Sequence, residues 1–160
     1  MKRILMTNGL LLLCILGFSQ KPEENGIIYI KHPYIDVVNQ TTKAYVGRDM
    51  ATNKKLYADT AHFWISGMKD NMPIGDAMKM WDTDFNFYDS IKVTTVGYPD
   101  YLHYKDKDQK WVQSWWIWHG KSKKTGQWID IDFVQFDGFN KDGKIIQEFL
   151  YGDFSKMVKE

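Results

Sequence analysis

The sequence predicts an α+β domain in which helices come first in the chain and pack on one face of a curved antiparallel sheet. Over residues 34–45 and 74–88 the apolar side chains recur at steps of three and four, which is the spacing of one helix face. Over residues 111–154 three apolar, aromatic and β-branched runs are separated by two polar turns, which is typical of an antiparallel meander. Helices followed by strands indicate the α+β class.

The helical region divides into three segments. The first helix is expected over Tyr34–Val46 and ends at Gly47. A second, short helix is expected over Met50–Ala58, with Asp49 as its N-cap. The third is expected over Ile74–Tyr88, where apolar residues again step by three or four. These helices carry the apolar faces that must cover the sheet.

Shorter extended segments lie before and between the helices and ahead of the meander. Ile27–Ile30 is short and apolar, so it forms an edge strand or simply docks on the domain. Ala61–Ile65 is predicted to be extended. Ile91–Tyr104 alternates only in part and is interrupted at Pro99, which predicts a strand with a bulge or an edge position.

The meander contains three runs, Trp111–His119, Trp128–Phe136 and Lys144–Tyr151, joined by GKSKKTG and DGFNKDG. Five of the seven tryptophans fall in the first two runs. Exposed apolar patches of that size are rare on soluble monomers. We therefore expect the helices to cover one face of this sheet.

The first 20 residues are interpreted as a secretory signal peptide, with a basic start at Lys2 and Arg3 and an apolar run over Leu10–Leu16. Small residues at Gly17 and Ser19 fit a cleavage site. Residues 21–33 are then a leader, and residues 34–160 form the domain. Localisation is therefore predicted to be secreted or periplasmic.

Removal of the signal peptide would leave 19 basic and 20 acidic residues, since two of the 21 basic residues are in it. Nothing in that balance points to nucleic acid or to anionic membrane as a partner, and no stable membrane insertion is expected after cleavage. The one cysteine, Cys14, would also be lost. Neither a disulfide nor thiol chemistry is then available.

Over about residues 34–155 the chain resembles the SnoaL-like branch of the nuclear transport factor 2-like superfamily. The residues that carry the resemblance are Thr125-Gly126 between two long strands, Asp142-Gly143-Lys144-Ile145 opening the last strand, Asp153 closing it, and Tyr57-Ala58-Asp59 followed by Phe63-Trp64. The family implies a cystatin-like cone, in which a strongly bent sheet wraps around helices and leaves a pocket. Related proteins include ketosteroid isomerases, scytalone dehydratases, polyketide cyclases and pocket proteins with no known reaction.

The resemblance implies that acids and histidines lining the cone transfer protons. On this basis Asp59, His62 and His119 are the candidate catalytic residues, because a base in an apolar cavity can have its ionisation tuned for that role. Structural roles compete with this reading. Asp59 also suits a cap or a turn, and His119 stands at a strand end before Gly120, as a rim histidine does.

Strand alternation assigns faces and so suggests pocket residues. In Trp128–Phe136 the face with Ile131 and Gln135 is the expected core, whereas Asp130 and Asp132 on the opposite face are read as solvated. In Lys144–Tyr151 the same logic turns Gln147 and Tyr151 toward the pocket. Both faces of Trp111–His119 are apolar, so alternation does not choose between them. The predicted pocket residues are Trp64, Trp81, Trp116, Trp118, Gln135, Gln147 and Tyr151.

No metal and no cofactor is predicted. The four histidines are scattered without paired ligand spacing, and the sequence has neither a Gly-rich phosphate loop nor a nucleophile elbow. Three functions remain open: binding of a hydrophobic small molecule, proton-transfer catalysis as an isomerase, dehydratase or cyclase, and homodimerisation through the aromatic sheet. A carbohydrate-binding β-sandwich would explain the tryptophans but not the helical stripes.

Overall fold

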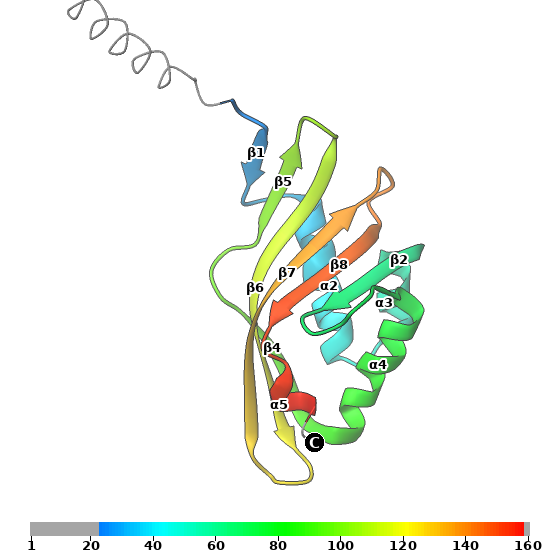
Figure 1. The fold of residues 1–160 in the computed structure, drawn as a ribbon, viewed down its shortest axis with the longest axis vertical. Coiled ribbons are helices and arrows are strands. Elements are labelled where there is room, and N and C mark those ends of the chain that lie inside the picture. The colour runs from blue at the N-terminus through cyan, green and yellow to red at the C-terminus, as the bar shows by residue number, and fades with distance from the viewer. Residues whose placement is uncertain (1–22, 159–160) are drawn as a thin grey trace, which may run out of the picture.

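The computed structural model describes residues 23–158, so the predicted signal peptide lies outside the described residues. The fold is α+β, with helices packed against one face of a bent eight-stranded sheet (Figure 1). The strands are β1 (Gly26–Tyr29), β2 (Tyr57–Ile65), β3 (Met72–Pro73), β4 (Tyr88–Thr95), β5 (Asp100–Tyr104), β6 (Gln109–Ser122), β7 (Trp128–Phe139) and β8 (Ile145–Gly152). The helices are α2 (Pro33–Val46), α3 (Met50–Leu56), α4 (Ile74–Phe87) and α5 (Ser155–Val158).

The sheet runs in the order β1-β5-β6-β7-β8-β2-β3, and β4 also pairs with β6. The meander of β6, β7 and β8 is antiparallel as predicted, but β2 pairs with β8 in parallel. The sheet is therefore mixed and not wholly antiparallel. Parallel strands need a long connection, and here the chain between β2 and β8 supplies α4 and most of the sheet.

The predicted helices and edge strand are confirmed, with ends shifted by one or two residues. Helix α2 has Pro33 in its first turn, and His32 caps it by accepting a hydrogen bond from the backbone N–H of Tyr34 at 3.2 Å. Asp49 caps α3 by accepting from the N–H of Thr52 at 2.9 Å. Strand β1 lies at the sheet edge on β5. Each boundary thus follows from local sequence.

The segment predicted as one interrupted strand forms two strands, β4 and β5, which pair with successive parts of β6. Residues 96–99 separate them, and Pro99 falls in this break. A proline lacks the N–H that a central strand must donate. Consequently one long strand, β6, is flanked along its length by two shorter ones.

Burial shows which face of β6 points inward. Val112, Ser114, Trp116 and Trp118 are all at most 4% exposed. The side chains between them are partly exposed. This inner face packs against α2 and α4, and Figure 1 shows α2 behind β7 and β8 with α4 to the side of β2. Together the helices and the concave sheet enclose the core.

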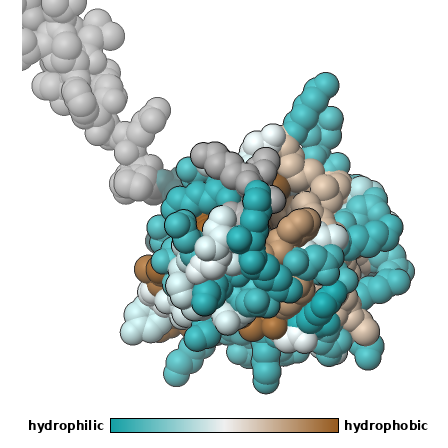
Figure 2. Space-filling view, turned by 90° about the horizontal axis from the view of Figure 1, so that it is seen from below, coloured by the Kyte–Doolittle hydropathy of each residue, from teal (hydrophilic) through white to brown (hydrophobic). Residues whose placement is uncertain are grey.

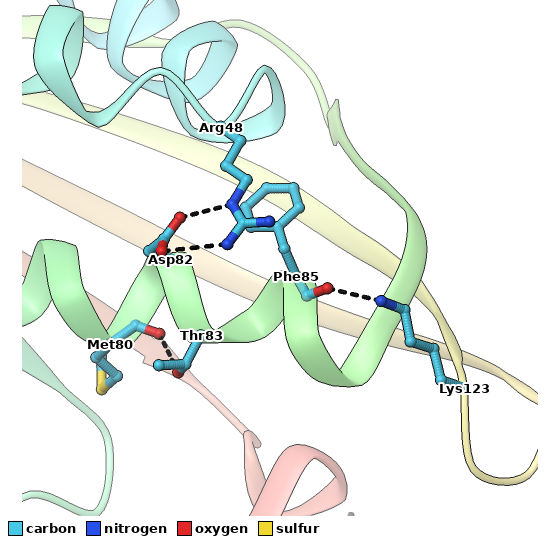
Figure 3. Close-up of polar contacts among 6 residues, drawn as sticks. All are labelled: Arg48, Met80, Asp82, Thr83, Phe85 and Lys123. Atoms are coloured by element: carbon cyan, nitrogen blue, oxygen red, sulfur yellow. Dashed lines mark hydrogen bonds and ion pairs between the residues drawn. The ribbon is translucent and has the colours of Figure 1, made fainter.

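Polar contacts tie the second half of α4 to its neighbours (Figure 3). The Arg48 guanidinium donates two hydrogen bonds to the Asp82 carboxylate, at 2.7 and 3.2 Å, and lies 5.3 Å from the centre of the Phe85 ring. On the other side, the Lys123 ammonium donates to the backbone carbonyl of Phe85 at 2.7 Å. These contacts link α4 to the α2–α3 turn and to the β6–β7 turn.

A bulge near the start of β8 changes the faces of that strand. Ile145 pairs with Phe139, and Gln147 pairs with Gly138, so Ile146 is an extra residue without a partner in the β7–β8 ladder. One extra residue reverses the inward and outward alternation from that point on. The assignment of faces in β8 from the unbroken period was therefore wrong after Ile145.

Beyond the bulge, Glu148 and Leu150 face the interior. Gln147 and Tyr151 lie on the opposite, outer face, where the Tyr151 ring is 5.8 Å from that of Phe136. The bulge thus places a carboxyl group where alternation had placed a glutamine.

Candidate functional site

A cavity of about 490 Å³ opens between the helices and the concave face of the sheet. Its walls are mostly aromatic and aliphatic, with contributions from Phe63, Trp81 and Leu150. Phe154 and Met157 line it from the C-terminal end. Figure 2 looks onto the end of the molecule that carries α5, where apolar residues show between charged ones. Besides the hydroxyls of Thr41, Thr42 and Ser66, which donate to backbone carbonyls, the polar groups at this cavity form two clusters and one isolated amide.

The first cluster contains Glu148, Tyr57, Asp137 and Gln135, and each of these side chains is at most 5% exposed. The Tyr57 hydroxyl donates a hydrogen bond to Glu148 Oε2. Asp137 lies opposite Glu148 across the β7–β8 ladder. Gln135 Nε2 donates to both oxygens of Asp137, at 3.2 and 3.0 Å. Of the two carboxyl groups, Glu148 lines the cavity and Asp137 stands behind it.

Burial makes both carboxyl groups weak acids. It raises the pKa of Glu148 to about 7, although the hydrogen bond from Tyr57 acts in the opposite direction. The pKa of Asp137 is raised well above its ordinary value, first by burial and then by the charge of Glu148. Two adjacent carboxylates in an apolar wall cannot both be ionised cheaply. This pair therefore holds a proton near neutral pH.

The second cluster contains Asp84, Tyr45 and Trp118, from α4, α2 and β6. The Tyr45 hydroxyl donates to Asp84 Oδ2 at 2.7 Å and accepts from Trp118 Nε1 at 2.9 Å. Burial raises the pKa of Asp84 to about 6, and the bond from Tyr45 opposes that rise. Asp84 forms no ion pair within residues 23–158. It is thus a carboxylate at neutral pH without a cationic neighbour.

The isolated amide is Asn53, the one buried residue of α3. It is 1% exposed and lines the cavity, and its Oδ1 atom has no hydrogen-bond partner in the described part of the chain. A buried acceptor without a donor is costly, and native structures contain few of them. Asn53 therefore leaves one acceptor unused in the wall of the cavity.

The candidate catalytic residues from the sequence lie outside this cavity. His62 is exposed because Ala61 and Phe63 on either side of it face inward. Asp59 is exposed where the pairing of β2 with β8 shifts register. His119 lies on the outer face of β6, next in sequence to the inward Trp118.

His119 has partners on that outer face. Its Nδ1 is 2.7 Å from an oxygen of Asp130, and its Nε2 is 3.0 Å from the Thr94 hydroxyl. Asp130 is itself 62% exposed in its side chain, in line with the reading of Asp130 and Asp132 as a solvated pair. No ring or carboxyl of the outer face reaches the cavity.

Of the predicted pocket residues, Trp81, Trp118 and Gln135 line the cavity. Trp116 is buried beside it, where its Nε1 donates to the Ser114 hydroxyl at 2.8 Å. The other three predicted pocket residues lie on the outer face of the sheet, one next to the inward Phe63 in β2 and two beyond the bulge in β8. They are Trp64, Gln147 and Tyr151.

Sequence reasoning missed six polar residues of the site, although some signals were present. Asp84 follows Trp81 by three residues, so it is an acid on the apolar stripe of a helix. Asp137 follows Gln135 by two and shares its inner face. Glu148 gave no such signal, because the bulge at Ile146 hid its face. The full set is Tyr45, Asn53, Tyr57, Asp84, Asp137 and Glu148.

No family model and no curated protein sequence matches the chain. Solved structures do. IdmH from Streptomyces antibioticus, a candidate polyketide cyclase, is 16% identical with a TM-score of 0.65 over 80% of this chain and 97% of that chain. A hypothetical protein with a ketosteroid isomerase-like fold from Catenulispora acidiphila, in complex with trimethylamine, is 12% identical with a TM-score of 0.62 over 78% and 90%.

A nuclear transport factor 2-like protein of unknown function from Exiguobacterium is 18% identical, with a TM-score of 0.58 over 74% of this chain and 98% of that chain. At such identities the likeness concerns the fold. The chain has the cone-shaped fold of the nuclear transport factor 2-like superfamily, to which the SnoaL-like proteins belong. Because this fold hosts unrelated functions, the chemistry must be argued from the cavity.

Two further findings concern the described residues. Within residues 23–158, no three His, Cys, Asp or Glu side chains are grouped as metal ligands would be. In the same part of the chain, no helix is long and apolar enough to cross a bilayer.

Proposed function

We propose that the cavity binds an apolar small molecule and that Glu148 transfers a proton to or from it. The observation that carries this proposal is the carboxyl group of Glu148, bonded to Tyr57, in the wall of a mostly apolar cavity. A general base works best when its pKa is near the working pH. With a pKa of about 7, Glu148 is both a competent base and a competent acid. Isomerisation, which removes a proton from one atom and returns it to another, suits such a group.

The neighbours of Glu148 support this role. Tyr57 holds the carboxyl group in one orientation through its hydroxyl hydrogen bond. Asp137 keeps a second proton close behind it, and Gln135 fixes Asp137 with two contacts from one amide nitrogen. Positioned groups of this kind lower the cost of a proton transfer because they need not reorganise during the step.

The test is a binding screen followed by an exchange assay. A panel of apolar ketones and alcohols is screened by thermal shift, because a ligand of the folded state raises its apparent stability. Each ketone that binds is then incubated in deuterated water, and the label next to its carbonyl is measured. We expect wild-type protein to introduce deuterium, and Glu148→Gln to bind the same ketone with at least a hundredfold slower exchange.

Asp59→Asn is the matched control, since it removes an exposed carboxyl group from β2. It should stay folded and exchange at the wild-type rate. Wild-type exchange by Glu148→Gln would overturn the catalytic role, and binding without any exchange would reduce the proposal to a ligand carrier. A panel without a single binder would contradict the ligand site itself.

We also propose a homodimer through the outer face of the sheet. An aromatic groove of about 480 Å³ lies there, lined by Trp111, Phe136, Phe149 and Tyr151 among others. The Trp111 and Phe149 rings stack at 6.0 Å, and Tyr151 is 47% exposed. Aromatic residues are enriched at interface cores. Light scattering of the purified domain should give twice the mass of one chain. The variant Tyr151→Lys should give the mass of one chain. A monomeric wild-type protein would refute the homodimer.

Export is the remaining part of the proposed function. It rests on the basic start, the apolar run and the small residues at 17 and 19 of the sequence. Mass spectrometry of the protein from a fractionated host should find a chain starting near residue 21 outside the cytoplasm. A full-length cytoplasmic chain would contradict export and would leave the cavity chemistry untouched.

A further inference from the structure

We propose that the ligand of this cavity carries a protonated amine, whose ammonium group sits between the Asp84 carboxylate and the faces of Trp81 and Trp118. This inference rests on the proposed ligand site and adds the chemical class of the ligand. Three independent features of the lining support it: charge, hydrogen-bonding capacity and aromatic surface.

The charge of the lining has one sign. Among the described residues, 23–158, those that line the cavity include two carboxyl groups, Asp84 and Glu148, and no lysine, arginine or histidine. An anionic ligand would bring a third acid into an apolar space without a cation to pair with, and buried unpaired charges are costly. A cationic ligand would instead give Asp84 the ion-pair partner that the described chain does not supply.

The hydrogen-bonding capacity around Asp84 is mainly that of an acceptor. The hydroxyls of Tyr45 and Tyr57 and the indole N–H of Trp118 already donate to protein acceptors. Asn53 Oδ1 is a buried acceptor without a partner, and Asp84 has lone pairs beyond the one that Tyr45 uses. An ammonium group has donors and no acceptor. It therefore fits the open acceptors near Asp84 better than a carboxylate group does, because a carboxylate would bring only further acceptors.

Aromatic rings surround the carboxylate of Asp84. Tyr45, which bonds Asp84, has its ring 6.5 Å from Trp81, and Trp118 bonds Tyr45 from the opposite wall. Ring faces attract cations, and tryptophan does so most strongly. A carboxylate beside these rings in a mostly apolar cavity is thus an ammonium site, and the apolar remainder of the cavity holds the body of the ligand.

The test uses three probes with one hydrocarbon body: 1-adamantanemethylamine, 1-adamantanemethanol and 1-adamantanecarboxylic acid. Calorimetry at pH 7.5 measures the affinity of each for the full domain. We expect the amine to bind at least tenfold more tightly than the alcohol and the acid to bind most weakly. In Asp84→Asn the amine should lose at least tenfold in affinity, whereas the alcohol should be unchanged.

Asp76→Asn is the control for net charge, because Asp76 is an exposed acid on the same helix; it should keep the wild-type preference. Trp81→Leu provides a second variant and should weaken the amine more than the alcohol. Equal binding of amine and alcohol by wild-type protein, or an amine preference retained in Asp84→Asn, would overturn the inference and leave the ligand site standing. Failure of all three probes to bind would contradict the ligand site as well.

Discussion

Glu148 shows how a single position in a strand sets the chemistry of a cavity. Its carboxyl group is 4% exposed and lies opposite the fully buried Asp137. Burial raises the pKa of both carboxyl groups, and the charge of Glu148 raises that of Asp137 further. At the other cluster, burial raises the pKa of Asp84 to about 6, and the hydrogen bond from Tyr45 opposes that rise. The two carboxyl groups of the lining therefore differ in charge at neutral pH.

The raised pKa of Glu148 predicts a pH-dependent stability. Between its ordinary value of 4.5 and about 7, the folded chain binds more protons at this site than the unfolded chain. The free energy of unfolding must then fall as pH rises through that window. We expect Glu148→Gln to exceed wild type by on the order of 3 kcal/mol at pH 8, at about 1.4 kcal/mol per pKa unit, and to match it near pH 5. Urea unfolding at both pH values measures this; equal stability at pH 8 would show that Glu148 ionises without penalty.

At the scale of elements, β6 and α4 position the Asp84 cluster. Strand β6 places Trp118 on its inner face, and the indole lies over Gly120, two residues further along the strand. A Cβ atom at Gly120 would come within 2.2 Å of that ring. The glycine thus makes room for the side chain that donates to Tyr45.

Gly120→Ala should therefore displace the Trp118 ring. We expect a loss of about 1–3 kcal/mol in unfolding free energy, which is typical of overpacking, together with a changed tryptophan fluorescence spectrum. Gly75→Ala is the matched control, since a Cβ there meets nothing within 4 Å and Gly75 lies in α4. That change should stabilise the protein by about 0.5–1 kcal/mol. A neutral Gly120→Ala would mean that the ring does not rest on the glycine.

For the whole molecule, burial of apolar surface matters more than surface ion pairs. The main core cluster joins α2, α4 and the inner faces of five strands, and Phe63 at its centre is completely buried. By contrast, the Arg48–Asp82 pair that ties α4 to the α2–α3 turn is 48% and 45% exposed in its side chains. Exposed pairs contribute little because water and salt screen them.

Two substitutions compare these contributions. Phe63→Ala should cost about 3–5 kcal/mol in unfolding free energy, as large-to-small changes in cores do. Asp82→Ala should cost at most about 1 kcal/mol, despite its two hydrogen bonds to Arg48. Guanidinium denaturation with a shared m-value measures both. A larger loss of unfolding free energy for Asp82→Ala than for Phe63→Ala would show that the Arg48–Asp82 ion pair, and not the core, holds α4 in place.

The sequence by itself determined the helices, the meander and the inner face of β7, because each depends on a local period. Gln135 was placed inward for that reason, and it lines the cavity. The tertiary structure alone decided the rest. Ile146 reverses the faces of β8 through a register shift, and Asp84 meets Tyr45 across 39 residues of chain. Contacts between distant segments depend on how strands and helices dock, and no short-range pattern encodes that register.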